Sequence, residues 1–350
     1  MTEAFDWRDK TVLVTGGTGT FGQAFCRYLL ESEPIRAVRV LSRDELKQWE
    51  MSRRIHDDRI RYFLGDVRDK DRLYRAFDGV DVVVHAAALK QVPAAEYNPF
   101  EAVKTNIIGA ENVIDAAIER GVQRVVALST DKAANPVNLY GATKLCAEKL
   151  FIQGNAYVGR HHARFSCVRY GNVVASRGSV VPLFMEQRDN GALSITDKRM
   201  TRYWITVREA VDFVKSAIEM MHGGELFVPK LPSVRITDLA EAVAPGVPVR
   251  EVGIRPGEKL HETLVTTEET RHALEGKDQF VIMPEHFPEL KELWSDLPPF
   301  AGDRPYGSDS NDSWLDVAEI AKRLPGALAE ARAYEAGVAI AREDAAALPE

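Results

Sequence analysis

The chain has 350 residues, of which 45% are hydrophobic and 28% charged, and its formal net charge is −7. This composition is that of a folded globular protein and excludes disorder along the whole length. The negative charge also excludes a general clamp for the phosphate backbone of DNA or RNA, so we expect no nucleic-acid partner. At this length we expect one large α/β domain with a smaller lobe.

The chain shows no membrane or targeting signal. No uninterrupted apolar run approaches the roughly 20 residues of a membrane-spanning helix, and the acidic N-terminal residues 1–6 do not fit a signal peptide. The three cysteines, Cys26, Cys146 and Cys167, lack the spacing of a metal site, so we expect reduced, buried thiols and no metal. We therefore expect a cytoplasmic location.

The N-terminal half predicts alternating strands and helices. A β-branched run at 10–15 ends at glycines and precedes helical apolar spacing from Thr20. Further strand patterns lie at 37–41, 60–64, 80–84, 122–128 and 165–168, and helical patterns lie near 44–54, 69–77, 98–120 and 136–157. This alternation predicts a doubly wound parallel sheet of the Rossmann type, with helices on both faces.

After Tyr170, glycines and prolines punctuate the sequence, which indicates a smaller, interleaved substrate-binding lobe. A helix at 207–221 and a strand at 226–228 are expected to return to the sheet. The expected division is 1–169 and 204–230 for the Rossmann domain, 170–203 and 231–325 for the substrate-binding lobe, and 326–350 for a C-terminal tail. We expect the alanine- and acid-rich end, 336–350, to fray.

The first strand and the first helix are joined by the pattern TGxxGxxG, from Thr15 to Gly22. Gly16 permits a tight turn, Gly19 lets the backbone approach a pyrophosphate, and Gly22 lets the helix pack closely on the strand. Alone this pattern is weak, but its position between a strand and a helix predicts a dinucleotide site rather than a structural turn. The expected cofactor contacts here are Gly16, Thr18, Gly19, Thr20, Phe21 and Gly22.

About 20 residues beyond the last glycine, dinucleotide folds place the group that distinguishes NAD from NADP. Ser42 stands where an NAD enzyme carries an acid, and Arg43 and Lys47 offer positive charge to the extra phosphate of NADP. Asp44 would suit the bare hydroxyl of NAD, or it simply favours the helix start. We expect NADP, with NAD the less favoured alternative.

Two later strand ends are expected to complete the cofactor site. Asp66 and Val67, after the third strand, are expected to contact the adenine. After the fourth strand, Ala86, Ala87 and Ala88 keep small side chains beside the cofactor.

The segment Ser129–Lys132 directly follows the fifth strand, at the sheet edge where ligands bind in this architecture. Asn135 and Pro136 are typical of a helix start. Tyr140 and Lys144 then lie four residues apart, on one face of that helix. Because an ammonium group lowers the pKa of a nearby phenol, this spacing predicts a tyrosine base working with a nicotinamide. An ordinary surface pair is the alternative.

These motifs make the chain resemble the extended short-chain dehydrogenases/reductases that act on nucleotide sugars. It is similar in particular to the inverting UDP-N-acetylglucosamine 4,6-dehydratases of pseudaminic acid biosynthesis. The resemblance covers roughly residues 8–285 and is carried by the blocks 89–93, 130–136, 138–144, 169–173, 176–179, 200–204 and 255–259. Retaining 4,6-dehydratases carry Asp-Glu where this chain has Asp131-Lys132, and the 5-epimerising dehydratases generally lack a tyrosine at the position of Tyr140.

The resemblance implies that UDP-N-acetylglucosamine is oxidised at C4, loses water across C5 and C6, and regains the hydride at C6 with C5 inverted. The implied product is UDP-2-acetamido-2,6-dideoxy-β-L-arabino-hex-4-ulose, used for nonulosonic acid or surface glycan biosynthesis. It further implies a tightly bound NADP that is regenerated in each cycle. Members usually form homo-oligomers, often hexamers, so we expect a homo-oligomer here.

The resemblance also implies roles for five catalytic residues. Tyr140 is the base at the C4 hydroxyl, Lys144 its electrostatic partner, and Thr130 a hydrogen-bond partner of the same oxygen. Lys132 takes the C5 proton, and Asp131 protonates the departing C6 hydroxyl. Because Lys132 and Asp131 each stabilise the charged form of the other, their individual roles stay open.

A UDP-sugar carries two phosphates, which require cationic groups outside the cofactor cradle. The expected substrate contacts are Arg202 and Arg255 for the phosphates, Asn172 and Arg177 near the pyrophosphate or sugar, Glu258 on uridine, and Lys90 at the sugar. Tyr203 and Trp204 are expected in the core at the lobe junction rather than on a base.

Three alternatives to this function remain. A UDP-hexose 4-epimerase needs Tyr140 and Lys144 but has no use for Asp131-Lys132. A retaining 4,6-dehydratase would share the dehydration but not the inversion. A non-catalytic NADP-binding regulatory protein would keep the fold without turnover.

Overall fold

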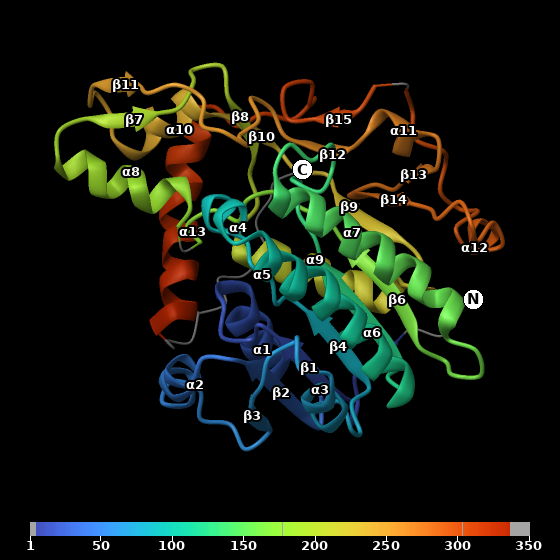
Figure 1. The fold of residues 1–350 in the computed structure, drawn as a ribbon. Coiled ribbons are helices and arrows are strands. Elements are labelled where there is room, and N and C mark those ends of the chain that lie inside the picture. Colours follow the sequence, from blue (N-terminus) through green and yellow to red (C-terminus); the bar gives the residue numbers. More distant parts are fainter. Residues whose placement is uncertain (1–4, 177, 303, 337–350) are drawn as a thin grey trace.

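A nine-stranded sheet lies at the centre of the computed structural model, which describes residues 5–336 except 177 and 303 (Figure 1). Its strand order is β13-β14-β9-β6-β5-β4-β1-β2-β3. These strands are β1 (Thr11–Thr15), β2 (Ala37–Ser42), β3 (Ile60–Leu64), β4 (Val82–His85), β5 (Arg124–Leu128), β6 (Arg164–Val168), β9 (Leu226–Pro229), β13 (Ala273–Glu275) and β14 (Gln279–Ile282).

Seven adjacent strands, from β9 to β3, run parallel, and β14 and β13 add an antiparallel edge. The predicted doubly wound sheet is therefore confirmed, as is the return of the 226–228 strand to it. The assignment of all of 231–325 to the lobe is wrong for residues 273–282. Their buried Phe280 and Val281 continue the core and cover the otherwise open edge of β9.

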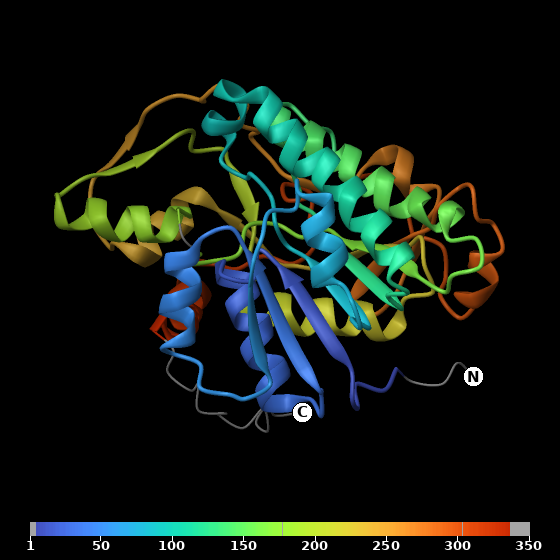
Figure 2. The same ribbon diagram turned by 60° about the horizontal axis from the view of Figure 1, so that its bottom comes forward.

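Helices cover both faces of the sheet (Figure 2). The main helices are α1 (Thr20–Ser32), α2 (Glu45–Ser52), α3 (Lys70–Ala76), α4 (Val92–Tyr97), α5 (Pro99–Val103), α6 (Gly109–Glu119), α7 (Leu139–Gly154), α8 (Val180–Asp189), α9 (Val207–Met220), α10 (Ile236–Val243) and α13 (Val317–Ala336). Helices α3, α6 and α7 pack side by side on one face, and α1, α9 and α13 pack together on the other.

Shorter elements complete the chain. The strand pairs β8–β10, β7–β11 and β12–β15 lie outside the main sheet. Their strands are β7 (Leu193–Ile195), β8 (Thr201–Tyr203), β10 (Ser233–Arg235), β11 (Val249–Glu251), β12 (Thr263–Val265) and β15 (Tyr306–Gly307). The short helices are the π-turn η1 (Lys104–Ile108), the 3-10 turn η2 (Asn155–Tyr157), α11 (Thr267–Thr270) and α12 (Leu290–Leu293). The helix predicted near 98–120 is thus α5, η1 and α6 in succession.

The helix that carries Tyr140 begins later than predicted. Asn135 has a left-handed backbone, with φ of 49°, so it and Pro136 lie in the preceding loop. The N-cap of α7 is Asn138, whose side-chain oxygen accepts a hydrogen bond from the Gly141 N–H at 2.8 Å. The predicted start at Asn135 is wrong because a second asparagine, three residues on, provides the cap.

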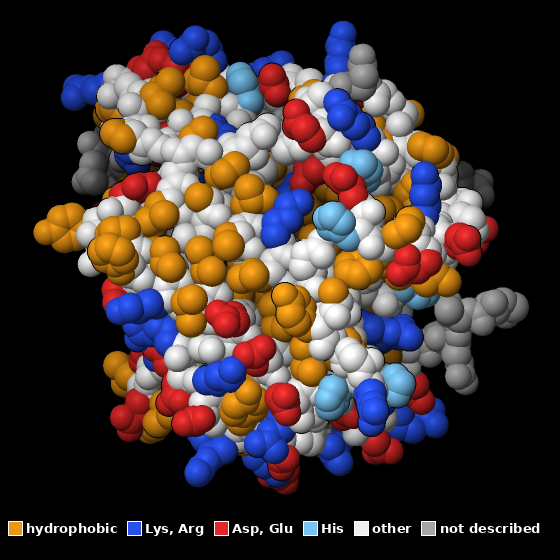
Figure 3. Space-filling model, turned by 45° about the vertical axis from the view of Figure 1, so that its right-hand side comes forward, with side chains coloured by type: hydrophobic (Ala, Val, Ile, Leu, Met, Phe, Trp, Pro, Cys, Tyr) orange, Lys and Arg blue, Asp and Glu red, His pale blue; other side chains and the backbone are white. Residues whose placement is uncertain are grey.

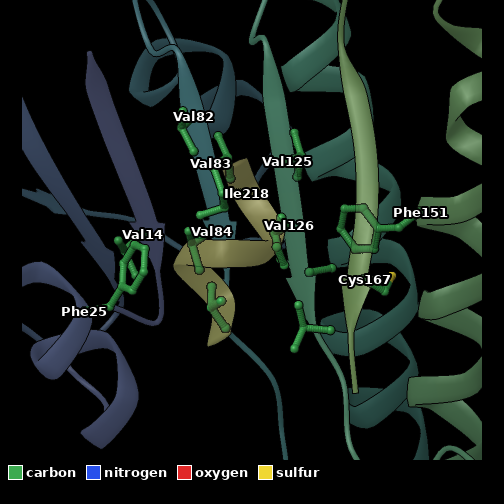
Figure 4. Close-up of a cluster of buried hydrophobic side chains, with 14 of the residues drawn as sticks. Val14, Phe25, Val82, Val83, Val84, Val125, Val126, Phe151, Cys167 and Ile218 are labelled. Atoms are coloured by element: carbon green, nitrogen blue, oxygen red, sulfur yellow. The ribbon is translucent and has the colours of Figure 1, made fainter. Parts of the chain in front are cut away.

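Valine-rich strands fill the main core between the two helix layers (Figure 4). Val82, Val83 and Val84 of β4 are fully buried, as are Val125 and Val126 of β5. Such continuous apolar strands are typical of a parallel sheet covered on both faces.

A second core is formed between α8, β7, α10 and α13, and it includes Trp204. Tyr203 belongs to the main core, so both aromatic residues are buried as expected. Helix α13 joins the two cores, because its Ala327 and Ala331 pack in the second and its Tyr334 in the first.

Residues 326–336, expected as the start of a C-terminal tail, belong to the packed helix α13. Alanines four residues apart form an apolar stripe on this helix. The end expected to fray lies outside the described residues from 337 onward. The division into domains otherwise stays a prediction.

Within the described ranges, no helix is long and apolar enough to cross a membrane. On the face drawn in Figure 3, acidic and basic side chains are interspersed. This mixture agrees with the modest net charge.

Candidate active site

A cavity of about 960 Å³ opens at the carboxyl ends of the parallel strands. Such an edge is where α/β sheets bind ligands, and the volume is that of a site for a large organic ligand. The predicted site residues on its wall are Gly16, Thr18, Gly19, Thr20, Phe21, Gly22, Ser42, Arg43, Lys47, Asp66, Val67, Ala86, Ala87, Ala88, Lys90, Thr130, Lys132, Tyr140, Lys144, Asn172, Arg202, Arg255 and Glu258. Asp131 lies buried behind Lys132, and Arg177 lies outside the described residues.

The glycine cradle fits a dinucleotide pyrophosphate. Gly16 has φ of 66°, and a Cβ there would lie 2.9 Å from the backbone of Ala87. A Cβ on Gly22 would lie 2.6 Å from the Cα of Gly17, so the helix and the loop make close backbone contact. The N-cap of the 13-residue α1 is Gly19, which has no side chain to bond the first N–H groups of the helix. The first N–H groups of α1 can therefore bind an anion.

The end of β2 carries the groups expected to distinguish the two nicotinamide cofactors. The Ser42 hydroxyl lies 2.8 Å from that of Thr18. The Asp44 carboxylate caps α2 by accepting the Lys47 N–H at 3.0 Å, and it also pairs with the Lys47 ammonium at 3.1 Å. Arg43, whose side chain is 50% exposed, lies 3.6 Å from Asp66. Asp44 is thus used as a helix cap, whereas Arg43 remains accessible at the cavity.

The end of β4 is fixed by two polar residues that the sequence analysis did not single out. The His85 Nδ1 lies 2.9 Å from the Thr15 hydroxyl, and burial lowers the pKa of His85 to about 3, so this imidazole is neutral. The Asn106 side chain binds both the N–H and the carbonyl of Leu89, at 2.8 and 3.0 Å, and also the hydroxyl of Thr143. Asn106 therefore ties the loop that carries Lys90 to α7. Its position inside the π-turn gave no sequence signal.

Tyr140 and Lys144 lie on the buried side of α7, as their spacing predicts. The Lys144 ammonium donates a hydrogen bond to the Leu128 carbonyl at 2.7 Å, which anchors α7 to the end of β5. Burial raises the pKa of Tyr140 to about 12, and the charge of Lys132 acts in the opposite direction. Lys132, from the preceding loop, is thus a second cation that acts on this phenol, and the electrostatic role expected for Lys144 stays a prediction.

Lys132 lies between two buried carboxylates. Its ammonium donates to Asp131 Oδ1 at 3.0 Å and to Asn172 Oδ1 at 3.3 Å, and it lies 3.6 Å from Glu262 Oε1. The Thr130 hydroxyl donates to the same Asp131 oxygen at 2.9 Å. Burial lowers the pKa of Lys132, but the charges of Asp131 and Glu262 outweigh this effect and raise the pKa. The sequence analysis missed Glu262, three residues after the quoted block 255–259.

Backbone contacts hold the loop before α7 in place. A Cβ on Gly141 would lie only 2.1 Å from the carbonyl oxygen of Lys132, so α7 touches the loop backbone there. The Lys259 ammonium donates to the Ala134 carbonyl at 2.5 Å, and the Asn138 side chain donates to the Gly257 carbonyl at 2.8 Å. The segment 255–259 thus supports the reacting loop as well as lining the cavity.

The two arginines predicted to bind phosphate differ in how far their guanidinium groups are already bonded by the chain. The Arg202 guanidinium donates to the carbonyls of Thr201 and Leu260 and lies 3.7 Å from Glu262. Arg255, 63% exposed, lies 3.7 Å from Glu258. Arg255 is therefore the more available cation for a substrate phosphate, whereas Arg202 is engaged by the chain.

Comparisons with known proteins agree with this site. A family model described as a polysaccharide biosynthesis protein matches residues 12–284. A protein of Campylobacter jejuni named UDP-N-acetylglucosamine 4,6-dehydratase (inverting) is 50% identical over 322 residues, which cover 89% of this chain and 96% of that relative. A UDP-glucose 4-epimerase of Rickettsia bellii is 45% identical over 274 residues, covering 76% of this chain and 80% of the relative.

Among solved structures, Pen from Bacillus thuringiensis superposes with a TM-score of 0.83 at 37% identity. The match covers 92% of this chain and 100% of that one. The shared fold therefore includes most of the smaller lobe as well as the main sheet.

We expect Gly141→Ala to lower the free energy of unfolding by about 1–3 kcal/mol, because its methyl group would overlap the Lys132 carbonyl. Denaturant unfolding measures this change. The matched control is Gly326→Ala in α13, where a Cβ meets open space and stability should not fall. Equal stabilities of the Gly141→Ala variant and the unmodified protein would contradict the close contact.

Proposed function

The chain belongs to the polysaccharide biosynthesis protein family, and from this premise we propose that it is an NADP-dependent UDP-N-acetylglucosamine 4,6-dehydratase that inverts C5. The carrying observation is the ion pair between buried Asp131 and Lys132, which lines the same cavity as Tyr140. A 4-epimerase needs only the tyrosine and its lysine, whereas dehydration needs further proton-transfer groups at C5 and C6. The 50% identity to the inverting dehydratase supports the same choice.

The residues at the end of β2 support NADP as the cofactor. Arg43 is accessible at the cavity, and Ser42 leaves room for a phosphate where a carboxylate would repel it. The cradle would hold the dinucleotide so that its nicotinamide supplies the acceptor for the C4 hydride and the donor of the same hydride to C6. Because the same molecule does both, we propose that NADP stays bound through the cycle.

Tyr140 takes the proton of the C4 hydroxyl in this proposal. Burial raises the pKa of its phenol, and the positive charge of Lys132 acts against this effect by favouring the phenolate. The Lys144 ammonium binds the Leu128 carbonyl, which holds the first turns of α7 on the end of β5 and thereby fixes the position of the Tyr140 phenol. Thr130 lines the same cavity, and its hydroxyl is proposed as a hydrogen-bond partner of the C4 oxygen.

The Asp131–Lys132 pair takes the C5 proton, which the C4 ketone makes acidic. The two side chains share a hydrogen bond of 3.0 Å, so a proton can pass between them. The retaining enzymes carry a glutamate at the position of Lys132. This difference is the reason for proposing inversion at C5.

The smaller lobe supplies the substrate contacts in this proposal. Arg202 and Arg255 are proposed for the diphosphate, Arg177 for the pyrophosphate or sugar, and Glu258 for uridine. Asn172 and Lys90 border the sugar. The product proposed is the 4-keto-6-deoxy sugar nucleotide for nonulosonic acid or surface glycan biosynthesis. A cytoplasmic homo-oligomer, up to a hexamer, remains a prediction.

Incubation of the purified protein with UDP-N-acetylglucosamine tests the function directly. Mass spectrometry should show a product lighter than the substrate by one water. A product of unchanged mass but altered C4 configuration would establish the epimerase instead, and an unchanged substrate with bound NADP would favour the non-catalytic protein.

We expect Lys132→Ala to reduce dehydration by about 10²–10⁴-fold, because the C5 proton then lacks its acceptor. Bound NADP should be retained, since the polar contacts of Lys132 are with Asp131, Asn172 and Glu262 and not with the glycine cradle. The matched control is Lys322→Ala, an exposed lysine on α13, which should keep full activity. Full dehydration by the Lys132→Ala protein would remove the reason for choosing the inverting enzyme.

We expect Arg43→Ala to weaken NADP binding by about 10- to 100-fold, the effect of losing a charged hydrogen bond to phosphate. NAD lacks that phosphate, so its dissociation constant should hardly change. Titration of both dinucleotides measures the ratio. An unchanged preference for NADP would show that Arg43 is not the group that recognises it.

A further inference from the structure

The Asp131–Lys132 pair lies in the loop 129–138, which joins β5 to α7 and contains neither helix nor strand. Asp131 and Ala134 are buried, so their backbone carbonyls need hydrogen-bond donors from within the protein. The Lys259 ammonium donates to the Ala134 carbonyl at 2.5 Å and to the Asp131 carbonyl at 3.4 Å. Within the described part of the chain, no other donor bonds the Ala134 carbonyl. The position of this loop therefore depends on Lys259, from the smaller lobe.

A tight turn separates Lys259 from Arg255. The Glu258 N–H donates to the Arg255 carbonyl at 3.1 Å, and Gly257, the third residue of the turn, has φ of 79°. Proline at the second position and a glycine with positive φ at the third are typical of a type II β-turn. Because Pro256 also fixes its own φ, the turn is stiff. A displacement of Arg255 is therefore passed on to Lys259.

Both lobes hold this turn in place. The Gly257 carbonyl accepts a hydrogen bond at 2.8 Å from the side chain of Asn138, the N-cap of α7, and a Cβ on Gly257 would lie 3.1 Å from the Asn138 Cβ. On the other side, the Arg202 guanidinium of β8 donates to the carbonyls of Lys259 and Leu260, at 3.2 and 3.0 Å. The turn is thus fixed between a strand of the smaller lobe and the start of α7.

The two ends of the segment 255–259 meet different parts of the proposed substrate site. Arg255 is 63% exposed and lines the cavity, where it is proposed to bind the diphosphate. Lys259 lines the same cavity and binds the loop that carries Asp131 and Lys132. One short segment therefore joins the nucleotide end of the site to its proton-transfer end.

We propose that Lys259 is a positioning residue, which couples binding of the substrate diphosphate at Arg255 to the placement of the Asp131–Lys132 pair. This inference rests on the proposed dehydratase function. Lys259 transfers no proton in this proposal, and it acts by holding the backbone carbonyls of the loop. The binding energy of the diphosphate, which does not react, is thereby used to fix the groups that do.

Lys259→Met tests this role, because methionine keeps a long apolar stem and removes the ammonium. Dehydration of UDP-N-acetylglucosamine by the full chain is measured over a range of substrate concentrations. We expect kcat to fall by about 10- to 100-fold, the effect of misplaced catalytic groups. KM should hardly change, since Arg255 still binds the diphosphate. A purely structural loss of folded protein would instead reduce the amount of active enzyme and its stability together, which denaturant unfolding measures.

Hydrogen–deuterium exchange with UDP as the probe measures the coupling without turnover. In the unmodified protein, UDP should slow the exchange of backbone amides in the loop 129–138 as well as in the segment 255–259. In the Lys259→Met protein, UDP should bind with the same Kd and slow exchange in 255–259 alone. The matched control is Lys277→Met, the same change on an exposed lysine outside the cavity, which should behave as the unmodified protein does.

Arg255→Ala provides a second test, and it also decides the question if Lys259→Met does not fold, because Arg255 is exposed. Loss of the diphosphate contact should lower kcat as well as raise KM, since the loop is then less well placed. In a protein that already carries Lys259→Met, the same change should raise KM alone.

Four results would overturn the role of Lys259. These are an unchanged kcat of Lys259→Met, weaker UDP binding by that variant, equal slowing of loop exchange by UDP with and without Lys259, and an unchanged kcat of Arg255→Ala. If UDP binds but the unmodified protein removes no water from UDP-N-acetylglucosamine, the proposed function fails, whereas the exchange experiment still tests the coupling. If UDP does not bind at all, both proposals fail.

Discussion

One electrostatic constraint shapes the reacting centre: a lysine ammonium is held between two buried carboxyl groups. Lys132 lies 3.0 Å from Asp131 and 3.6 Å from Glu262, and both carboxyl groups are buried. A buried cluster of this kind costs desolvation free energy and is a weak source of stability. Its value is that three ionisable groups lie close enough together to exchange protons over short distances. The rest of the fold serves to hold these groups beside a cofactor cradle and a sugar site.

Three separate parts of the chain meet at this cluster. Asp131 and Lys132 follow β5, Tyr140 begins α7, and Glu262 precedes β12 in the smaller lobe. Gly141 permits the contact between α7 and the Lys132 carbonyl, and Lys259 binds the same loop from the other lobe. A change in either lobe is therefore transmitted to the reacting residues through direct backbone contacts.

Much of this arrangement could be predicted from the sequence, because its signals are local. The buried valine strands, the glycine pattern and the spacing of Tyr140 and Lys144 each report their own surroundings, and the structure places them as expected. The start of α7 was misplaced because Asn135 and Asn138 offer competing caps, and only the fold decides between them. Glu262 and Asn106 act through contacts distant in the chain, so no spacing pattern marked them. The antiparallel edge formed by residues 273–282 was missed for the same reason.

The central claim is that the hydride removed from C4 is returned to C6 of the same sugar. UDP-N-acetylglucosamine labelled with deuterium at C4, followed by mass spectrometry and NMR of the product, measures this most directly. The account expects a product lighter by one water, with the deuterium in its new methyl group. Deuterium that is lost to solvent, or that is found at C4 of a product of unchanged mass, would contradict it.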